Sequence, residues 1–129
     1  MDHLTLHDLL TSRANILDGK TVVSITLRDY GIHFDLFPGI QLEIIEYWEL
    51  LNSQGELIDN ALTTENRKNF FLFKVIGKKV RATEKFFDKF HITFEGEMVF
   101  VIHFDHKAQV DKREEERKKY FGDLNQEEI

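Results

Sequence analysis

The sequence predicts an α+β fold in which two α-β-β-β meander repeats surround a shared core and a C-terminal helix follows them. Three observations support this fold. When the chain is shifted by 58 positions, Gly19–Val22 falls on Gly77–Val80. In both copies apolar and polar residues then alternate, which is the period of a half-buried strand. A segment with helical spacing precedes each copy. A unit that cannot bury its apolar face alone is expected to bury it against its copy.

The repeat preserves an apolar rhythm more than residue identity. The aligned pairs are Ile32 with Phe90, Phe34 with Ile92, Leu36 with Phe94, Ile40 with Met98, Leu42 with Phe100, Ile44 with Ile102, and His33 with His91. The apolar members of these pairs are the predicted core.

The first repeat spans about residues 5–51 and is expected to open with a helix over about 5–14. Thr5 is the expected N-cap, with Asp8 reaching back to it as in a capping box. Leu6 and Leu9 follow at the spacing that places side chains on one helical face.

Three strands complete the first repeat and form a meander. The segment Phe37-Pro38-Gly39 is expected to join the second strand to the third, because proline fixes its own φ and glycine tolerates a positive φ. The third strand is predicted to run from Ile40 to about Leu51 without a break. Leu57-Ile58 is a candidate for a short extra strand after it.

The second repeat spans about residues 63–106. A helix is predicted from about Thr63, with Gly77 as the residue that ends it. The local pattern Phe70–Phe73 fits a buried strand as well, but the alignment with the first repeat favours the helix.

Two registers are open for the second hairpin of this repeat. If it matches the first repeat, Phe94 faces Met98, and Val99 and Val101 point outward. If Glu95-Gly96 forms a two-residue turn, both valines face the core, because a one-residue slip reverses every side chain. The repeat favours the first register. The segment 109–121 is then expected to form the C-terminal helix, and the whole chain, 1–129, a single domain.

Composition limits the classes of function. The chain has 129 residues and a formal net charge of −6. The absence of cysteine excludes disulfides, zinc–thiolate sites and cysteine nucleophiles, and the reducing cytoplasm is the expected compartment. We expect no signal peptide and no membrane span. The negative charge disfavours nucleic acid as a partner, favours a basic protein, and by itself also keeps a small protein soluble.

The histidines offer little basis for catalysis. In the matched hairpins His33 lies opposite Glu43, which makes either a general base with its orienting carboxylate or a solvated cross-strand pair. His91 lies opposite Val101 and lacks such a partner. No P-loop, Gly-x-Gly-x-x-Gly or Gly-x-Ser-x-Gly motif occurs. We therefore expect no enzyme activity, no metal site and no cofactor.

An outward acidic face of the first repeat is the predicted partner-binding site. Its residues are Asp35, Glu43, Tyr47 and Glu49, with Tyr47 as the aromatic anchor of the kind found at interface hot spots. Two alternatives remain open: a strand face that is merely solvated, and a catalytic carboxylate pair, which requires a cleft.

One resemblance adds to this interpretation. Gly19-Lys20-Thr21-Val22, the segment Phe37–Ile44 and Trp48 resemble small bacterial proteins with a duplicated β-meander. These are often encoded near polymorphic or contact-dependent growth-inhibition toxins, and several look like immunity proteins. The similarity covers about residues 16–106; the second repeat keeps the glycine and valine but lacks the proline and tryptophan.

The resemblance implies an immunity protein that neutralises a cognate toxin by direct protein–protein contact. If that toxin is a basic nuclease domain, an acidic protein associates with it quickly and occludes its active site. The expected oligomeric state is a monomer or a weak homodimer.

Two functions of other classes also fit the sequence. One is a small enzyme or ligand-binding domain with a pocket between the two repeats and His33 or His91 at its mouth. The other is a homodimerising module in which Val99 and Val101 form a self-complementary patch.

Overall fold

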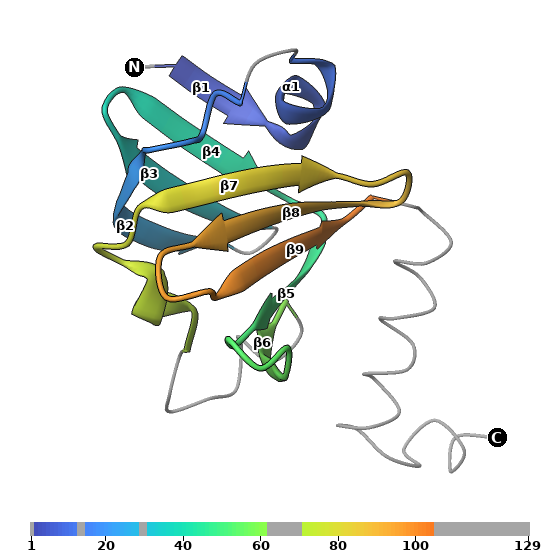
Figure 1. Cartoon of the computed structure of the whole chain (residues 1–129). Coiled ribbons are helices and arrows are strands. Elements are labelled where there is room, and N and C mark those ends of the chain that lie inside the picture. Colours follow the sequence, from blue (N-terminus) through green and yellow to red (C-terminus); the bar gives the residue numbers. More distant parts are fainter. Residues whose placement is uncertain (1, 13–14, 29–30, 62–70, 105–129) are drawn as a thin grey trace, which may run out of the picture.

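The fold is mostly β, as the computed structural model of the chain shows (Figure 1). The structure describes residues 2–12, 15–28, 31–61 and 71–104. Within these residues there are nine strands, one short α-helix and one 3-10 helix. The predicted α+β class is therefore wrong for the described chain. None of its helices is long and apolar enough to cross a membrane.

The strands form two sheets. The first has the order β1-β4-β3-β2 and the second the order β6-β5-β9-β8-β7. The elements, in chain order, are β1 (Asp2–Thr5), α1 (Leu6–Thr11), β2 (Thr21–Arg28), β3 (Gly31–Phe37), β4 (Ile40–Ile44), β5 (Tyr47–Leu51), β6 (Leu57–Asn60), the 3-10 helix η1 (Phe71–Val75), β7 (Val80–Lys85), β8 (Lys89–Phe94) and β9 (Val99–His103).

Both predicted three-stranded meanders are present, and their registers match residue for residue. Phe34 pairs with Leu42 in the first, and the aligned Ile92 pairs with Phe100 in the second. Even the irregularities correspond, because β2 shifts register between residues 22 and 24 and β7 between residues 80 and 82. The N–H of Phe94 donates to the carbonyl of Met98 at 2.8 Å, which confirms the first of the two open registers.

The two meanders are joined by a symmetric backbone junction. Gly19 N–H donates to Val80 O at 2.8 Å, and Gly77 N–H donates to Val22 O at 2.7 Å. Two further equivalent hydrogen bonds are present: Val22 N–H donates to Lys78 O at 3.0 Å, and Val80 N–H donates to Lys20 O at 2.7 Å. A local two-fold axis therefore passes between the aligned residues 21 and 79, which form an antiparallel bridge.

The core lies between the inner faces of the two meanders. The ring of Phe100 meets Phe34 edge-on at 5.1 Å between centroids and stacks on Trp48 at 5.3 Å. The apolar residues that were predicted to face inward on β3, β4, β8 and β9 are buried, with Met98 packed against them. One small cavity of about 10 Å³ lies among these side chains, next to Phe34, Leu42 and Ile92.

The predicted third strand of the first repeat is interrupted. The chain bends at residues 45–46, where Ile45 is exposed, and β5 leaves the first sheet to pair with β9 of the second. Ile44 and Trp48 lie on either side of the bend and are both buried. The bend allows one segment to contribute to the core from both sheets, which continuous alternation along 40–51 does not reveal.

The predicted helices are largely absent from the described residues. In place of a helix over 5–14, β1 pairs in parallel with β4, and α1 has only six residues. The capping box is confirmed, because Thr5 N–H donates to Asp8 Oδ2 at 2.8 Å. Only Leu6 and Leu9 of α1 are buried, so little apolar surface supports a longer helix.

The second predicted helix falls mostly outside the described residues. Its last part, 71–75, is the 3-10 helix η1, and the strand alternative for Phe70–Phe73 does not hold for residues 71–73. Leu72 N–H donates to the buried carboxylate of Asp59 at 2.8 Å, which ties η1 to β6. The C-terminal helix predicted over 109–121 lies outside the described residues, whereas the short extra strand predicted at Leu57-Ile58 is present as β6.

The core assignment predicts a large cost for Phe100→Ala. The substitution removes the ring that contacts both Phe34 and Trp48, and the free energy of unfolding is expected to fall by about 3–5 kcal/mol. Urea denaturation measures this. Phe87→Ala is the control: its ring is 91% exposed, so its expected effect is below about 0.5 kcal/mol. Similar losses in the two variants would contradict the assignment.

Candidate functional site

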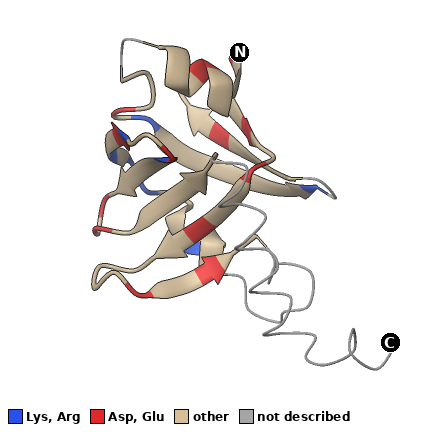
Figure 2. Cartoon of the chain, turned by 90° about the vertical axis from the view of Figure 1, so that its right-hand side faces the viewer, with Lys and Arg blue, Asp and Glu red and all other residues tan. Residues whose placement is uncertain are grey.

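The outward side of the first sheet is a continuous polar surface. Alternation along β2, β3 and β4 places apolar residues in the core and polar residues outside. We call this surface the acidic face; it consists of Ser24, Thr26, His33, Asp35, Gln41 and Glu43. Acidic positions occur on strands of both sheets (Figure 2); on this face Asp35 accepts hydrogen bonds from two neighbouring strands.

Asp35 is held in place by its neighbours on both sides. Ser24 Oγ donates to Asp35 Oδ2 at 2.6 Å, and Gln41 Nε2 donates to Asp35 Oδ1 at 3.2 Å. The three residues come from three adjacent strands, so the register of the meander sets the contact. The carboxylate therefore has a fixed orientation before any partner arrives.

The predicted pair of His33 and Glu43 is present but loose. His33 Nε2 lies 3.7 Å from Glu43 Oε1, which is too long for a hydrogen bond. The His33 side chain is 16% exposed and that of Glu43 is 37% exposed. Within the described residues neither ring nitrogen of His33 has a hydrogen-bond partner. The pair does not form an oriented general base, and Glu43 is available to a partner.

The structure separates the four predicted binding residues into two pairs. Asp35 and Glu43 lie on the acidic face, whereas Tyr47 and Glu49 belong to β5 in the second sheet. Tyr47 is fully buried, so it is not the exposed anchor that the sequence predicted. Residues 43 and 49 share parity along the chain, but the bend at 45–46 sends them to different sheets.

Glu49 forms a close pair with His103. His103 Nε2 lies 2.6 Å from Glu49 Oε1, and the two side chains are 10% and 12% exposed. The Tyr47 and His103 rings lie 5.6 Å apart between centroids. The sequence does not indicate this contact, because β5 of the first repeat pairs with β9 of the second. The one sequence signal for the contact of Glu49 with His103 is the recurrence of His and Glu at outward positions of the strands.

His91 has an environment unlike that of its repeat-related residue His33. Its ring lies 4.7 Å from the ring of Phe86 between centroids. Burial, and next the positive charge of Lys89, lower the pKa of His91. The neutral ring is therefore favoured in the folded protein. With Val101 opposite it, His91 forms no catalytic counterpart to the first repeat.

A small cavity of about 110 Å³ lies between elements of the two repeats. It is lined by Leu9, Ser12, Asn15, Ile16, Leu17, Thr83, Lys85 and Phe90. Neither His33 nor His91 lines it, although the pocket hypothesis placed one of them at the mouth. In the part of the chain that the structure describes, no three His, Asp or Glu side chains gather in a way that could hold a metal ion.

Comparisons of the chain with protein-family models, with curated proteins and with solved structures give no match. The resemblance to immunity proteins therefore stays a prediction from the sequence. Three features of the described residues bear on function: the acidic face, the nearly buried pair of Glu49 and His103, and the small cavity.

The two acidic side chains of the predicted site should differ in their effect on stability. Glu49→Ala removes the carboxylate that contacts the nearly buried His103 ring and is expected to lower the free energy of unfolding by about 1–3 kcal/mol. Glu43→Ala removes only a loose, partly exposed contact and should change it by less than about 1 kcal/mol. Urea denaturation distinguishes the two. A smaller loss for Glu49 than for Glu43 would be inconsistent with this geometry.

His91 should make the fold less stable in acid. Because its folded-state pKa is lowered, the unfolded chain, with an ordinary pKa of 6.5, binds the proton more readily. The contribution of His91 to the free energy of unfolding is fully present above the ordinary pKa. It is lost as the pH falls through the lower pKa of the folded state. We expect His91→Gln to weaken the decline of unfolding free energy between about pH 7.5 and 5. His7→Gln, at an exposed position of α1, is the control; an equal change of slope would refute the assignment to His91.

Proposed function

We propose that this chain is a non-catalytic binding protein that neutralises a basic protein partner by direct contact, as an immunity protein does with its cognate toxin. The observation that carries the proposal is the acidic face, on which Asp35 is already fixed by Ser24 and Gln41. The net charge of −6 supports it, since opposite charges accelerate association.

The geometry of the acidic face favours recognition of lysine and arginine side chains. Asp35 forms its hydrogen bonds within the sheet, so little ordering is left to occur on binding, and preorganisation of this kind raises affinity. Glu43 supplies a second carboxylate on a neighbouring strand. A basic nuclease domain presents the complementary charge, because such enzymes bind phosphate. Occluding that basic surface would inhibit the toxin without a catalytic step.

The four residues first assigned to partner binding are given different roles in this proposal. Asp35 and Glu43 contact the partner. Tyr47 and Glu49 are buried or nearly buried and hold β5 against β9. A cytoplasmic location is part of the proposal, since a cysteine-free chain suits a reducing compartment.

A small enzyme or ligand-binding domain is the alternative, and the cavity of about 110 Å³ is the observation that favours it. Binding sites for drug-sized ligands have volumes of about 300–1,000 Å³. The cavity is smaller than this range, and no histidine lines it. We therefore prefer the binding protein.

The proposal predicts that charge reversal on the acidic face weakens binding. Glu43→Lys should reduce affinity for a basic protein partner captured by the wild-type chain by at least about tenfold, because it places like charges in contact. Pull-down followed by calorimetry measures this. Glu84→Lys on the exposed edge of β7 is the control, since it makes the same change in net charge. Equal losses would show that only net charge matters, and no binding by the wild-type chain would remove the function itself.

A further inference from the structure

Two repeat-related strands form edges of their sheets, and they differ in chemistry. β2 ends the first sheet and β7 ends the second (Figure 1). They hydrogen-bond to each other only near their starts, through the junction of residues 19–22 with 77–80. Beyond that junction, within the described residues, neither strand has a neighbour on its outer edge. Both therefore present backbone groups that another strand can pair with.

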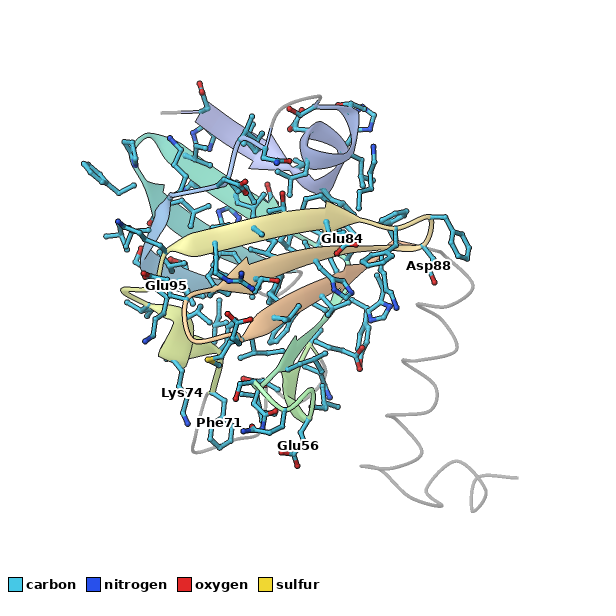
Figure 3. All side chains as sticks on the ribbon, in the orientation of Figure 1. Glu56, Phe71, Lys74, Glu84, Asp88 and Glu95 are labelled. Carbon is cyan, nitrogen blue, oxygen red and sulfur yellow. The ribbon has the colours of Figure 1, made fainter. Side chains whose placement is uncertain are left out.

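Charged residues occur along β7, whereas β2 is neutral up to Arg28 at its end. β7 carries Arg81, Glu84 and Lys85 (Glu84 is labelled in Figure 3). The aligned positions of β2 carry Val23, Thr26 and Leu27, and the valine and leucine are 56% and 42% exposed. Charged side chains on an edge strand discourage pairing with another chain. The centre of β7 therefore has this protection and the centre of β2 lacks it.

The residues of β2 are complementary to themselves in an antiparallel pair. When a two-fold axis passes through Thr26, Ile25 lies opposite Leu27 of the second copy and Ser24 lies opposite Arg28. Apolar and β-branched cross-strand pairs of this kind stabilise a sheet, and no like charges meet. The same operation on β7 would place Glu84 opposite Glu84, which is destabilising.

We propose that β2 is a homodimer edge, at which a second copy of this chain adds its own β2 antiparallel and extends the first sheet across the axis. The two-fold axis is perpendicular to the sheet, so both acidic faces lie on the same side and form one larger surface. The proposed homodimer goes beyond the proposed binding function and does not depend on it. It also differs from the predicted patch at Val99 and Val101, because Val101 is buried.

The dimer should be weak. Pairing through one short strand buries less than the roughly 1,200 Å² at which stable interfaces begin. We therefore expect a dissociation constant above about 10 µM, with dimers dominant only toward millimolar concentration.

Crosslinking tests the register directly, because the natural chain has no cysteine. Thr26→Cys puts two thiols opposite each other on the axis, within the Cα separation of about 4.4–6.8 Å that a disulfide needs. Oxidation at high protein concentration should convert this variant to a covalent dimer. Arg81→Cys, at an exposed position of β7, leaves Glu84 in place and should stay mainly monomeric. Equal crosslinking of the two variants, or none in either, overturns the proposal.

Sedimentation of the full chain tests the unmodified edge. The wild type should dimerise reversibly between about 10 µM and 1 mM, and Thr26→Glu should weaken the dimer about fivefold or more by placing two carboxylates on the axis. Thr26→Val keeps a neutral β-branched residue and should retain dimerisation. Circular dichroism and a thermal melt establish that each variant is folded. A monomeric wild type at 1 mM, or a dimer that folded Thr26→Glu leaves intact, overturns the proposal.

Discussion

Burial of two one-sided sheets against each other is the constraint on which this structure depends. Each meander has an apolar face that water would contact if the meander stood alone, and the other meander provides the matching surface. Phe100 is at the centre of this contact, between Phe34 and Trp48. The backbone junction of residues 19–22 with 77–80 fixes how the two units meet, because four hydrogen bonds related by a local two-fold axis leave little freedom in their relative placement.

Several irregular features follow from that constraint. The bend at residues 45–46 lets β5 pair with β9, so that Trp48 reaches the shared core from the second sheet. β1 takes the corresponding position beside β4 in the first sheet, although in parallel orientation. The symmetry of the two meanders is therefore close in register and broken at their outer neighbours. This broken symmetry separates the acidic face from the Glu49–His103 pair.

Function is proposed to lie on the surfaces that the core leaves outside. The acidic face is ordered by the same register that builds the sheet, because Ser24, Asp35 and Gln41 come from three adjacent strands. The repeat also offers an internal comparison, since β2 and β7 share an origin in the alignment but carry different residues at their edges. Charges along β7, and a β2 whose one charged residue is Arg28 at its end, are consistent with one strand that stays solvated and one that takes a partner.

The sequence by itself determined the meanders and their alternation, because inward and outward residues are encoded locally with a period of two. The register of the second hairpin came from the alignment of the two repeats, since the local pattern left two registers open. The sequence also determined the capping box at Thr5 and the turn at Phe37–Gly39. Only the tertiary structure decided which strands become neighbours across the repeats. The bend that moves Tyr47 and Glu49 into the second sheet, and the 2.6 Å contact of Glu49 with His103, depend on residues more than 50 positions apart in the chain. The helices were overpredicted because helical spacing shows which residues would share one face of a helix. It does not show whether the fold offers an apolar surface against which that face can pack.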